Sequence, residues 1–265
     1  MRGAFTWDPA QYVRYADQRG RPFEELVARI GIEAPQRIVD LGCGPGSLTR
    51  TLADRWPGAT VTGIDSSPAM IASAAEHAEP GRIEFACADL HDWHPGSAVD
   101  IVIGNAVLQW VPGHRQLLAG FAGWLAPGGA LAFQVPDNFS EPSHTVIREL
   151  RLLPRWRDRL GQGADRSVAV ETPETYLEAL VDAGLEPDVW QRTYLHVLTG
   201  DDPVLDWVKG TALRPVLDAL AGDQAATREF LAECGARLRE VYPAQEYGTV
   251  FPFRRTFAVG HRRAA

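Results

Sequence analysis

Cysteine is scarce in this chain, whose 265 residues include only Cys43, Cys87 and Cys234. An odd number with no closely spaced pair predicts neither a disulfide framework nor a zinc site, because both need cysteines at matched positions. No apolar run reaches the ~18 residues of a membrane-spanning helix, and the first residues lack the apolar core of a signal peptide. We therefore expect a cytoplasmic protein with no membrane partner and no bound metal.

Basic residues are also in deficit, with 26 lysines and arginines against 34 aspartates and glutamates, so the formal net charge is −8. No basic run is long enough to form a concentrated patch, and we do not expect nucleic acid as a partner. Apolar residues make up 45% of the chain, enough for one full core with an inserted subdomain. A monomer that binds a small molecule is the simplest expectation.

The most informative stretch, residues 37–47, reads as a short apolar strand that runs into the turn Gly42-Cys-Gly44-Pro-Gly46. Because glycine has no Cβ, the chain can turn tightly here and a ligand can lie almost against the backbone. Asp40 adds a carboxylate near the end of this strand, and Asp65 closes the next apolar strand. A carboxylate in that second position can accept both hydroxyl groups of a ribose. The combination predicts an adenosine site.

The third glycine distinguishes two adenosine ligands. The dinucleotide fingerprint Gly-x-Gly-x-x-Gly needs a glycine at position 47, where this chain has Ser47. Residues 39–46, Val-Asp-Leu-Gly-Cys-Gly-Pro-Gly, instead resemble the first motif of class I S-adenosylmethionine-dependent methyltransferases. The resemblance implies S-adenosyl-L-methionine as the cofactor and S-adenosyl-L-homocysteine as its product. A dinucleotide oxidoreductase is an alternative.

Strand and helix patterns alternate after Arg37, which is typical of a parallel sheet with helices on both faces. Strands are predicted at 38–41, 60–64, 83–87, 99–103, 129–135, 185–198 and 251–260. Helices are predicted at 47–55, 68–78, 114–124, 172–183, 206–208, 213–220 and 225–242. The resemblance implies an α/β, Rossmann-like fold in which a seven-stranded, mostly parallel sheet has an antiparallel last strand.

Four parts are expected along the chain. They are an N-terminal helical lid (1–35), the donor-binding core (36–136), a mostly helical cap that includes strand six (137–248) and the last strand of the sheet (249–265). Aromatic residues such as Tyr12 crowd the first part. Rings that cover a sulfonium cation would attract it by about 0.5–2 kcal/mol, although a helix packed on the sheet edge is an equal alternative.

The donor should bind at the carboxyl ends of the parallel strands, where ligands of such sheets bind. Asp89 is placed to accept from the adenine amino group, Met70 to lie over the adenine, and Asn105 to hold the donor's amino group. Cys43 has no base nearby in sequence, so we expect it to fill space and not to act as a nucleophile. The expected donor-binding residues are Asp40, Gly42, Cys43, Gly44, Asp65, Ser66, Met70, Asp89, Leu90 and Asn105.

The last strand carries an arginine in an otherwise apolar row, because alternation places Arg255 on the same face as Phe251, Phe253 and Phe257. Such an arginine needs an anionic partner or a route to water. Pointed at an acceptor, its planar fork would match a carboxylate. A structural ion pair is the alternative.

A narrower resemblance covers nearly the whole chain. The motifs that carry it are Trp7-Asp-Pro9 with Tyr12, Asn105-Ala-Val-Leu-Gln109-Trp110, Pro136-Asp-Asn138 with His144, Asp206-Trp207 to Arg214-Pro215, and Phe253-Arg254-Arg255. Together they resemble trans-aconitate methyltransferases. The resemblance implies esterification of one carboxylate of trans-aconitate, with Arg255, Arg214, Tyr12, Trp110 and His144 as acceptor-binding residues in falling order. Arg254 departs from the family pattern, in which proline is common at this position.

The implied chemistry needs no general base, because a carboxylate with a pKa of about 4 is already ionised near neutral pH. Catalysis should come from aligning oxygen, methyl carbon and sulfur and from excluding water. Two further functions remain open: a methyltransferase for another small molecule, such as a phenol, amine or enol carbon, and a non-catalytic S-adenosylmethionine-binding regulator.

Overall fold

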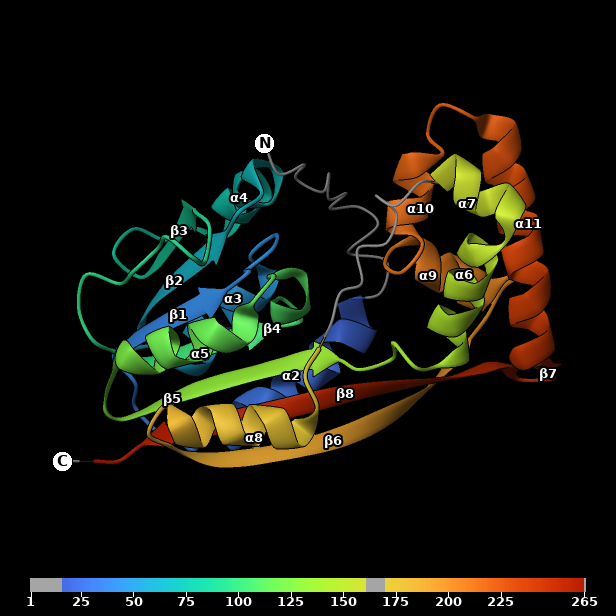
Figure 1. Ribbon diagram of the computed structural model, residues 1–265. Coiled ribbons are helices and arrows are strands. Elements are labelled where there is room, and N and C mark those ends of the chain that lie inside the picture. Colours follow the sequence, from blue (N-terminus) through green and yellow to red (C-terminus); the bar gives the residue numbers. More distant parts are fainter. Residues whose placement is uncertain (1–15, 161–169, 265) are drawn as a thin grey trace. The chain divides into compact units, whose positions relative to one another are not determined.

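A computed structural model describes residues 16–160 and 170–264 of the chain (Figure 1). The segment expected to form the lid helix, with Tyr12, lies outside the described residues. The described residues form two compact units. The first contains the residues up to Pro136, residues 170–192 and the residues from Thr256 onward, and the second contains residues 137–160 and 193–255.

The strands form one sheet with the order β3-β2-β1-β4-β5-β8-β6. The strands are β1 (Arg37–Leu41), β2 (Thr60–Asp65), β3 (Ile83–Cys87), β4 (Val99–Asn105), β5 (Leu125–Pro136), β6 (Leu185–Leu198), β7 (Ala244–Gln245) and β8 (Gly248–Arg262). Strands β1 to β5 pair in parallel, whereas β8 runs antiparallel to β5 (Figure 1). The predicted α/β Rossmann-like fold is confirmed. The two-residue β7, which pairs with β8 outside the seven-strand path, was not predicted.

Register aligns the carboxyl ends of the central strands. Leu41 of β1 pairs with Ile64 of β2 on one side and with Gly104 of β4 on the other. The residues that follow these three strands therefore gather at one edge of the sheet. Strand β4 is buried almost throughout, as expected for a parallel strand covered on both faces.

The described helices of the first unit are α2 (Ala16–Arg29), α3 (Ser47–Arg55), α4 (Pro68–Ala74), η1 (Ala75–His77), η2 (Leu108–Trp110), α5 (His114–Gly123) and α8 (Pro173–Asp182). Two of them, α4 and α8, begin with a capping side chain and a proline. The hydroxyl of Ser67 accepts from the N–H of Met70, and Pro68 occupies the first turn of α4. Thr172 caps α8 in the same way. The predicted helix 68–78 is thus α4 continued by the 3₁₀ turn η1.

The second unit is mostly helical. Its helices are α6 (Pro142–Leu152), α7 (Pro154–Leu160), α9 (Pro203–Lys209), α10 (Arg214–Ala219) and α11 (Gln224–Val241). The amphipathic stretch 148–160 is divided between α6 and α7 because Pro154 forces Leu153 into an extended conformation. Helix α11 buries Phe230, Cys234 and Leu238 along one face.

Candidate active site

The turn after β1 needs glycine for two different reasons. Gly42, Gly44 and Gly46 have positive φ angles of 65°, 56° and 83°, which disfavour residues with side chains. A Cβ at Gly42 would lie 2.3 Å from Cγ2 of Val107, so packing also excludes one there. A Cβ at Gly44 would meet no atom of the described residues within 4 Å. These residues therefore leave open space beside Gly44, where a ligand can approach the backbone.

The carboxylate of Asp65 joins this turn to the loop after β2. Its Oδ2 accepts a hydrogen bond from the N–H of Gly44 at 3.0 Å, and its Oδ1 accepts one from the N–H of Ser67 at 2.8 Å. Burial raises the pKa of this carboxyl, and the two N–H donors oppose that shift. Because a carboxylate has about four lone-pair sites, Asp65 keeps capacity to accept from the hydroxyl groups of a ribose.

Asp40 lies beneath the turn and is 2% exposed. The hydroxyl of Thr49 on α3 donates to its Oδ2 at 2.6 Å. Burial raises the pKa of Asp40 to about 7, against the lowering effect of Thr49 and together with repulsion from Asp65. Near neutral pH this carboxyl is therefore poised between its two protonation states. A cation bound close by would favour the ionised form.

Cys43 contributes a neutral side chain to the same turn. Its thiol is buried and donates weakly to the carbonyl of Gly44, with a distance of 3.7 Å. Burial, followed by the nearby carboxyls of Asp40 and Asp65, raises the pKa of the Cys43 thiol far above its usual range. The thiolate that a nucleophile would need is not accessible at physiological pH.

The loops after β2 and β3 carry the other donor candidates on neighbouring strands. Asp65 pairs with Cys87 in register, so Ser66 and Asp89 follow strand ends that lie side by side. Asp89 is half-exposed, and its Oδ1 accepts from the N–H of His91 at 2.9 Å. Met70, in the first turn of α4, and Leu90 are buried. The sheet thus brings the donor candidates of β1, β2 and β3 to one edge.

A strained residue directly follows the end of β4. Ala106 has a φ of 54°, which is unusual for a residue with a side chain. The backbone and side chain of Gln134 hold this bend, because its carbonyl accepts from the N–H of Ala106 at 3.0 Å and its Nε2 donates to Oδ1 of Asn105 at 2.6 Å. The amide of Gln109 donates to the carbonyl of Ala106 at 2.6 Å. These contacts fix the direction of the chain between Asn105 and the turn that holds Trp110.

Sequence reasoning missed Gln134 and Ala106. A glutamine within the apolar stretch Ala-Leu-Ala-Phe-Gln-Val-Pro of β5 was a signal, since a buried amide must find hydrogen-bond partners. Ala106 gave no signal, because alanine rarely adopts a positive φ and nothing in its neighbours indicates one.

Three of the acceptor candidates lie in the second unit. Arg255 is 4% exposed, and its guanidinium lies 4.8 Å from the centroid of the Phe253 ring. Arg214 begins α10 and forms an ion pair with Asp218 at 3.6 Å. His144 lies in the first turn of α6, where burial, followed by the charge of Arg148, lowers its pKa to about 4.

The remaining two candidates lie elsewhere. Trp110 is in η2 of the first unit, directly after the strained segment that ends β4. Tyr12 lies outside the described residues. The donor candidates and Trp110 therefore belong to the first unit, and Arg255, Arg214 and His144 to the second.

Comparison with known proteins gives a consistent result along the whole chain. Residues 38–129 match a family described as "Methyltransferase domain". A trans-aconitate 2-methyltransferase of Streptomyces avermitilis is 55% identical, and the match covers 98% of both chains. The trans-aconitate 2-methyltransferase of Rhodococcus jostii is 47% identical over 96% of this chain and 98% of its own. This chain belongs to the trans-aconitate 2-methyltransferase family.

The fold agrees with this family assignment. The solved structure of the YcgJ protein from Bacillus subtilis superposes with a TM-score of 0.60 at 14% identity, covering 93% of this chain and 100% of that one. The enzyme is accordingly an S-adenosylmethionine-dependent methyltransferase. Among the described residues, no helix has the length and apolar character needed to cross a membrane.

The residues of the turn fit the adenosyl donor. The space beside Gly44 lets a ligand contact the backbone, Asp65 keeps acceptor capacity next to it, and Asp40 is a buried acid that a cation would ionise. The sulfonium and ammonium groups of S-adenosylmethionine supply such cations. These features are compatible with an adenosyl donor at this turn, and the donor-binding roles of the residues stay a prediction.

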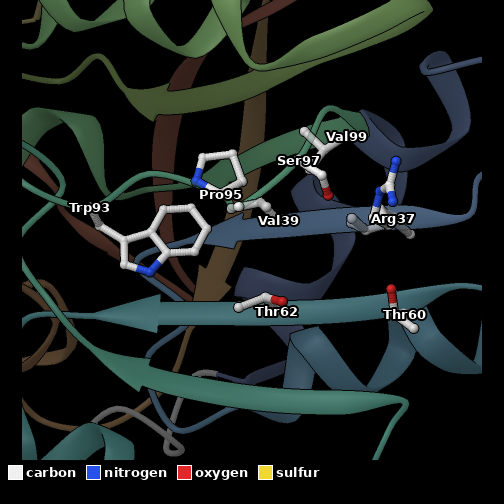
Figure 2. A pocket seen from close by; sticks show the side chains of 10 residues that line it. Arg37, Val39, Thr60, Thr62, Trp93, Pro95, Ser97 and Val99 are labelled. Carbon is white, nitrogen blue, oxygen red and sulfur yellow. The ribbon is translucent and has the colours of Figure 1, made fainter.

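A separate cavity of about 130 Å³ lies over the opposite halves of β1 and β2 (Figure 2). Arg37, Val39, Thr60 and Thr62 line it from the strands, and the loop around Trp93 covers it. No donor candidate lines this cavity. It results from the connection between β3 and β4, which is a loop where the other central crossovers contain helices.

Proposed function

We propose that this enzyme transfers a methyl group from S-adenosylmethionine to one carboxylate of trans-aconitate, giving a monomethyl ester and S-adenosylhomocysteine. One observation carries the proposal. The relative from Streptomyces avermitilis, named for this acceptor, is 55% identical over 98% of both chains, so the similarity includes the second unit as well as the donor-binding core. We further propose a cytoplasmic monomer, with residues 1–35 as a lid and residues 137–248 as an acceptor-selecting cap.

The first unit would hold the donor. The carboxylate of Asp65 accepts the ribose hydroxyls, Asp89 accepts from the adenine amino group, and Met70 packs against the base. Asn105, whose amide is oriented by Gln134, meets the donor's amino group. Bound S-adenosylmethionine supplies a methyl carbon that is activated by its positive sulfur. Asp40 would become ionised beside these positive charges, which raises the affinity for the donor.

The acceptor residues would bind charge without moving protons. Arg255 and Arg214 are permanently charged and match carboxylates of the polyanion. His144, with a pKa of about 4, stays neutral at physiological pH and contributes a hydrogen bond, not a charge. Trp110 and Tyr12 would exclude water from the reacting carboxylate. Since that carboxylate is already ionised, no residue is needed as a general base.

Turnover with a panel of acceptors tests the proposal. Purified enzyme is incubated with methyl-labelled donor and, separately, with trans-aconitate, cis-aconitate, citrate, a phenol and a primary amine. We expect label in an ester of trans-aconitate, and mass spectrometry should place it at the position that the relatives' name numbers 2. If label appeared only in the phenol or only in the amine, the acceptor would belong to that class of compound and the proposed esterification would be wrong. Tight donor binding without turnover on any acceptor would indicate a regulator.

A further inference from the structure

Two adjacent arginines of β8, Arg254 and Arg255, have different surroundings. The guanidinium of Arg254 lies among groups of the segment that follows β5. Its Nε donates to Oδ2 of Asp137 at 3.1 Å and to the carbonyl of the same residue at 3.2 Å. Its Nη1 lies 3.5 Å from Oε1 of Glu141, and its Nη2 donates to Ser140 at 3.3 Å. Two carboxylates of its own unit therefore neutralise Arg254.

Asn138 holds the backbone of the same residue. Its Oδ1 accepts from the N–H of Arg254 at 2.9 Å, and its Nδ2 donates to the carbonyl of Arg254 at 2.9 Å. The N–H of Asp137 donates to that carbonyl as well, also at 2.9 Å. Asn138 is 1% exposed, so water does not replace these bonds. One amide side chain thus pairs with both main-chain groups of residue 254, as the next residue of a strand would.

Fixing residue 254 also fixes the direction of residue 255. Successive side chains of a strand point to opposite faces, so Arg255 projects away from the side that Asp137 and Glu141 occupy. There its guanidinium stacks on Phe253, and the ring of Phe253 in turn lies 5.5 Å from that of Trp207. The orientation of Arg255 therefore depends on a backbone that Asn138 holds at the strand edge, while the side chain of Arg254 is held on the opposite face.

We infer that Asn138 and Arg254 are positioning residues that orient Arg255 for acceptor binding, an inference that rests on the proposed function. We call the Asp137, Asn138, Glu141 and Arg254 contacts the β8 anchor. Neither Asn138 nor Arg254 needs to touch the acceptor for this role. In the β8 anchor the charge of Arg254 is paired with Asp137 and Glu141, so that Arg254 does not compete with Arg255 for the same polyanion.

Steady-state kinetics with matched variants tests the anchor. We expect Asn138→Ala and Arg254→Gln to raise the KM for trans-aconitate by roughly tenfold or more, with kcat and the donor Kd changed less than about threefold. Arg254→Lys, which keeps the charge but not the fork, should give a smaller increase. Arg239→Gln is the control, because it removes an ion pair with Asp202 in the same unit without touching β8.

A second readout does not depend on the acceptor. The Nε–Hε resonance of Arg255, assigned by its loss in Arg255→Lys, should broaden or shift in Asn138→Ala and Arg254→Gln but not in Arg239→Gln. An unchanged resonance in both anchor variants overturns the inference, whatever the kinetics. So does an unchanged KM in folded variants when Arg255→Lys itself raises KM. If wild-type enzyme esterifies no polycarboxylate while the resonance still responds, the proposed function fails and the anchor stands. Should Asn138→Ala not fold, the two Arg254 variants provide both measurements.

Discussion

The hydroxyl of Tyr176 lies 2.8 Å from Nε2 of His114, within the buried part of the first unit. The other ring nitrogen of His114 lies 3.2 Å from the carbonyl of Val111, so Nδ1 carries the proton and Nε2 accepts from the tyrosine. Burial lowers the pKa of His114, which keeps the imidazole neutral. The N–H of Glu171 donates to the same hydroxyl at 3.3 Å, so Tyr176 joins three chain segments.

We predict that Tyr176→Phe lowers the free energy of unfolding by about 1–3 kcal/mol, because it leaves His114 and the Glu171 N–H without this partner. Urea denaturation at pH 7.5 measures the change. Tyr247→Phe is the control, since Tyr247 is exposed and the same loss of a hydroxyl should cost little there. Equal stability of both variants would mean that the buried hydrogen bond contributes nothing.

The second prediction concerns Asp65, whose two oxygens each accept a backbone N–H. In Asp65→Asn one of these oxygens becomes an amide NH₂, which repels the facing N–H and cannot accept from a ribose hydroxyl. We expect the affinity for S-adenosylhomocysteine to fall at least tenfold, about 1.4 kcal/mol, as measured by titration calorimetry. Asp92→Asn, at an exposed position of a neighbouring loop, should leave the affinity unchanged. A shared loss in both variants would point to net charge instead of local geometry.

Much of the fold was predictable because its central strands are apolar runs with clear ends. The predicted strand 38–41 and the observed β1 differ by one residue at the start, and both end at Leu41, directly before Gly42. Strand β6 was predicted with the observed bounds. Local patterns of this kind are visible in a single sequence because they depend on neighbours along the chain.

The contacts that shape the candidate site were less predictable. Asn138 and Arg254 are separated by 116 residues, and neither local sequence indicates that one side chain pairs with the other's backbone. The strain at Ala106 likewise depends on Gln134, a residue of another strand. Sequence motifs predicted which residues bind the donor and the acceptor, whereas the hydrogen-bond partners of those residues are set by the tertiary fold.

The third prediction follows from the buried acid Asp40. Its pKa in the folded protein, about 7, lies above the ordinary value of 3.8, so folding favours the protonated form. The stabilisation is therefore complete below about pH 4 and is lost as the pH rises through about 7. A shift of about three pKa units corresponds to a contribution to the free energy of unfolding of at most on the order of 4 kcal/mol. Asp40→Asn, which resembles the protonated acid, should gain stability relative to wild type as the pH rises from 5 to 8.

Urea denaturation of both proteins at pH 5, 6, 7 and 8 measures this difference. All other titrating groups are shared, so the difference between the two curves isolates Asp40. Asp100→Asn, near the start of β4, would be a poor control, because Asp100 accepts from the N–H groups of Gln36 and Arg37. Asp92→Asn, at an exposed position, is the better control. A difference that does not vary with pH would show that Asp40 titrates as an ordinary carboxyl.

The fourth prediction separates ester formation from methylation of a phenol or amine. A carboxylate acceptor is fully ionised above pH 7, and arginine does not titrate in the accessible range. We therefore expect kcat/KM for trans-aconitate to stay level between pH 7.5 and 9, above the titration of Asp40. An enzyme that must deprotonate its acceptor would instead accelerate through this interval. The values of kcat/KM should be measured at constant ionic strength across this pH range, because a change in salt concentration alone alters the attraction of the enzyme for a polyanion.

The last prediction concerns Arg255, which is buried in an aromatic setting and stacked on Phe253. Arg255→Lys keeps one positive charge but loses the planar fork that matches a carboxylate with two parallel hydrogen bonds. We expect the KM for trans-aconitate to rise by roughly tenfold or more, about 1.4 kcal/mol or more, while the donor Kd stays within about twofold. Arg237→Lys on α11, whose arginine pairs with Glu233, controls for the exchange itself. Equal losses of donor and acceptor affinity would identify Arg255 as a structural residue.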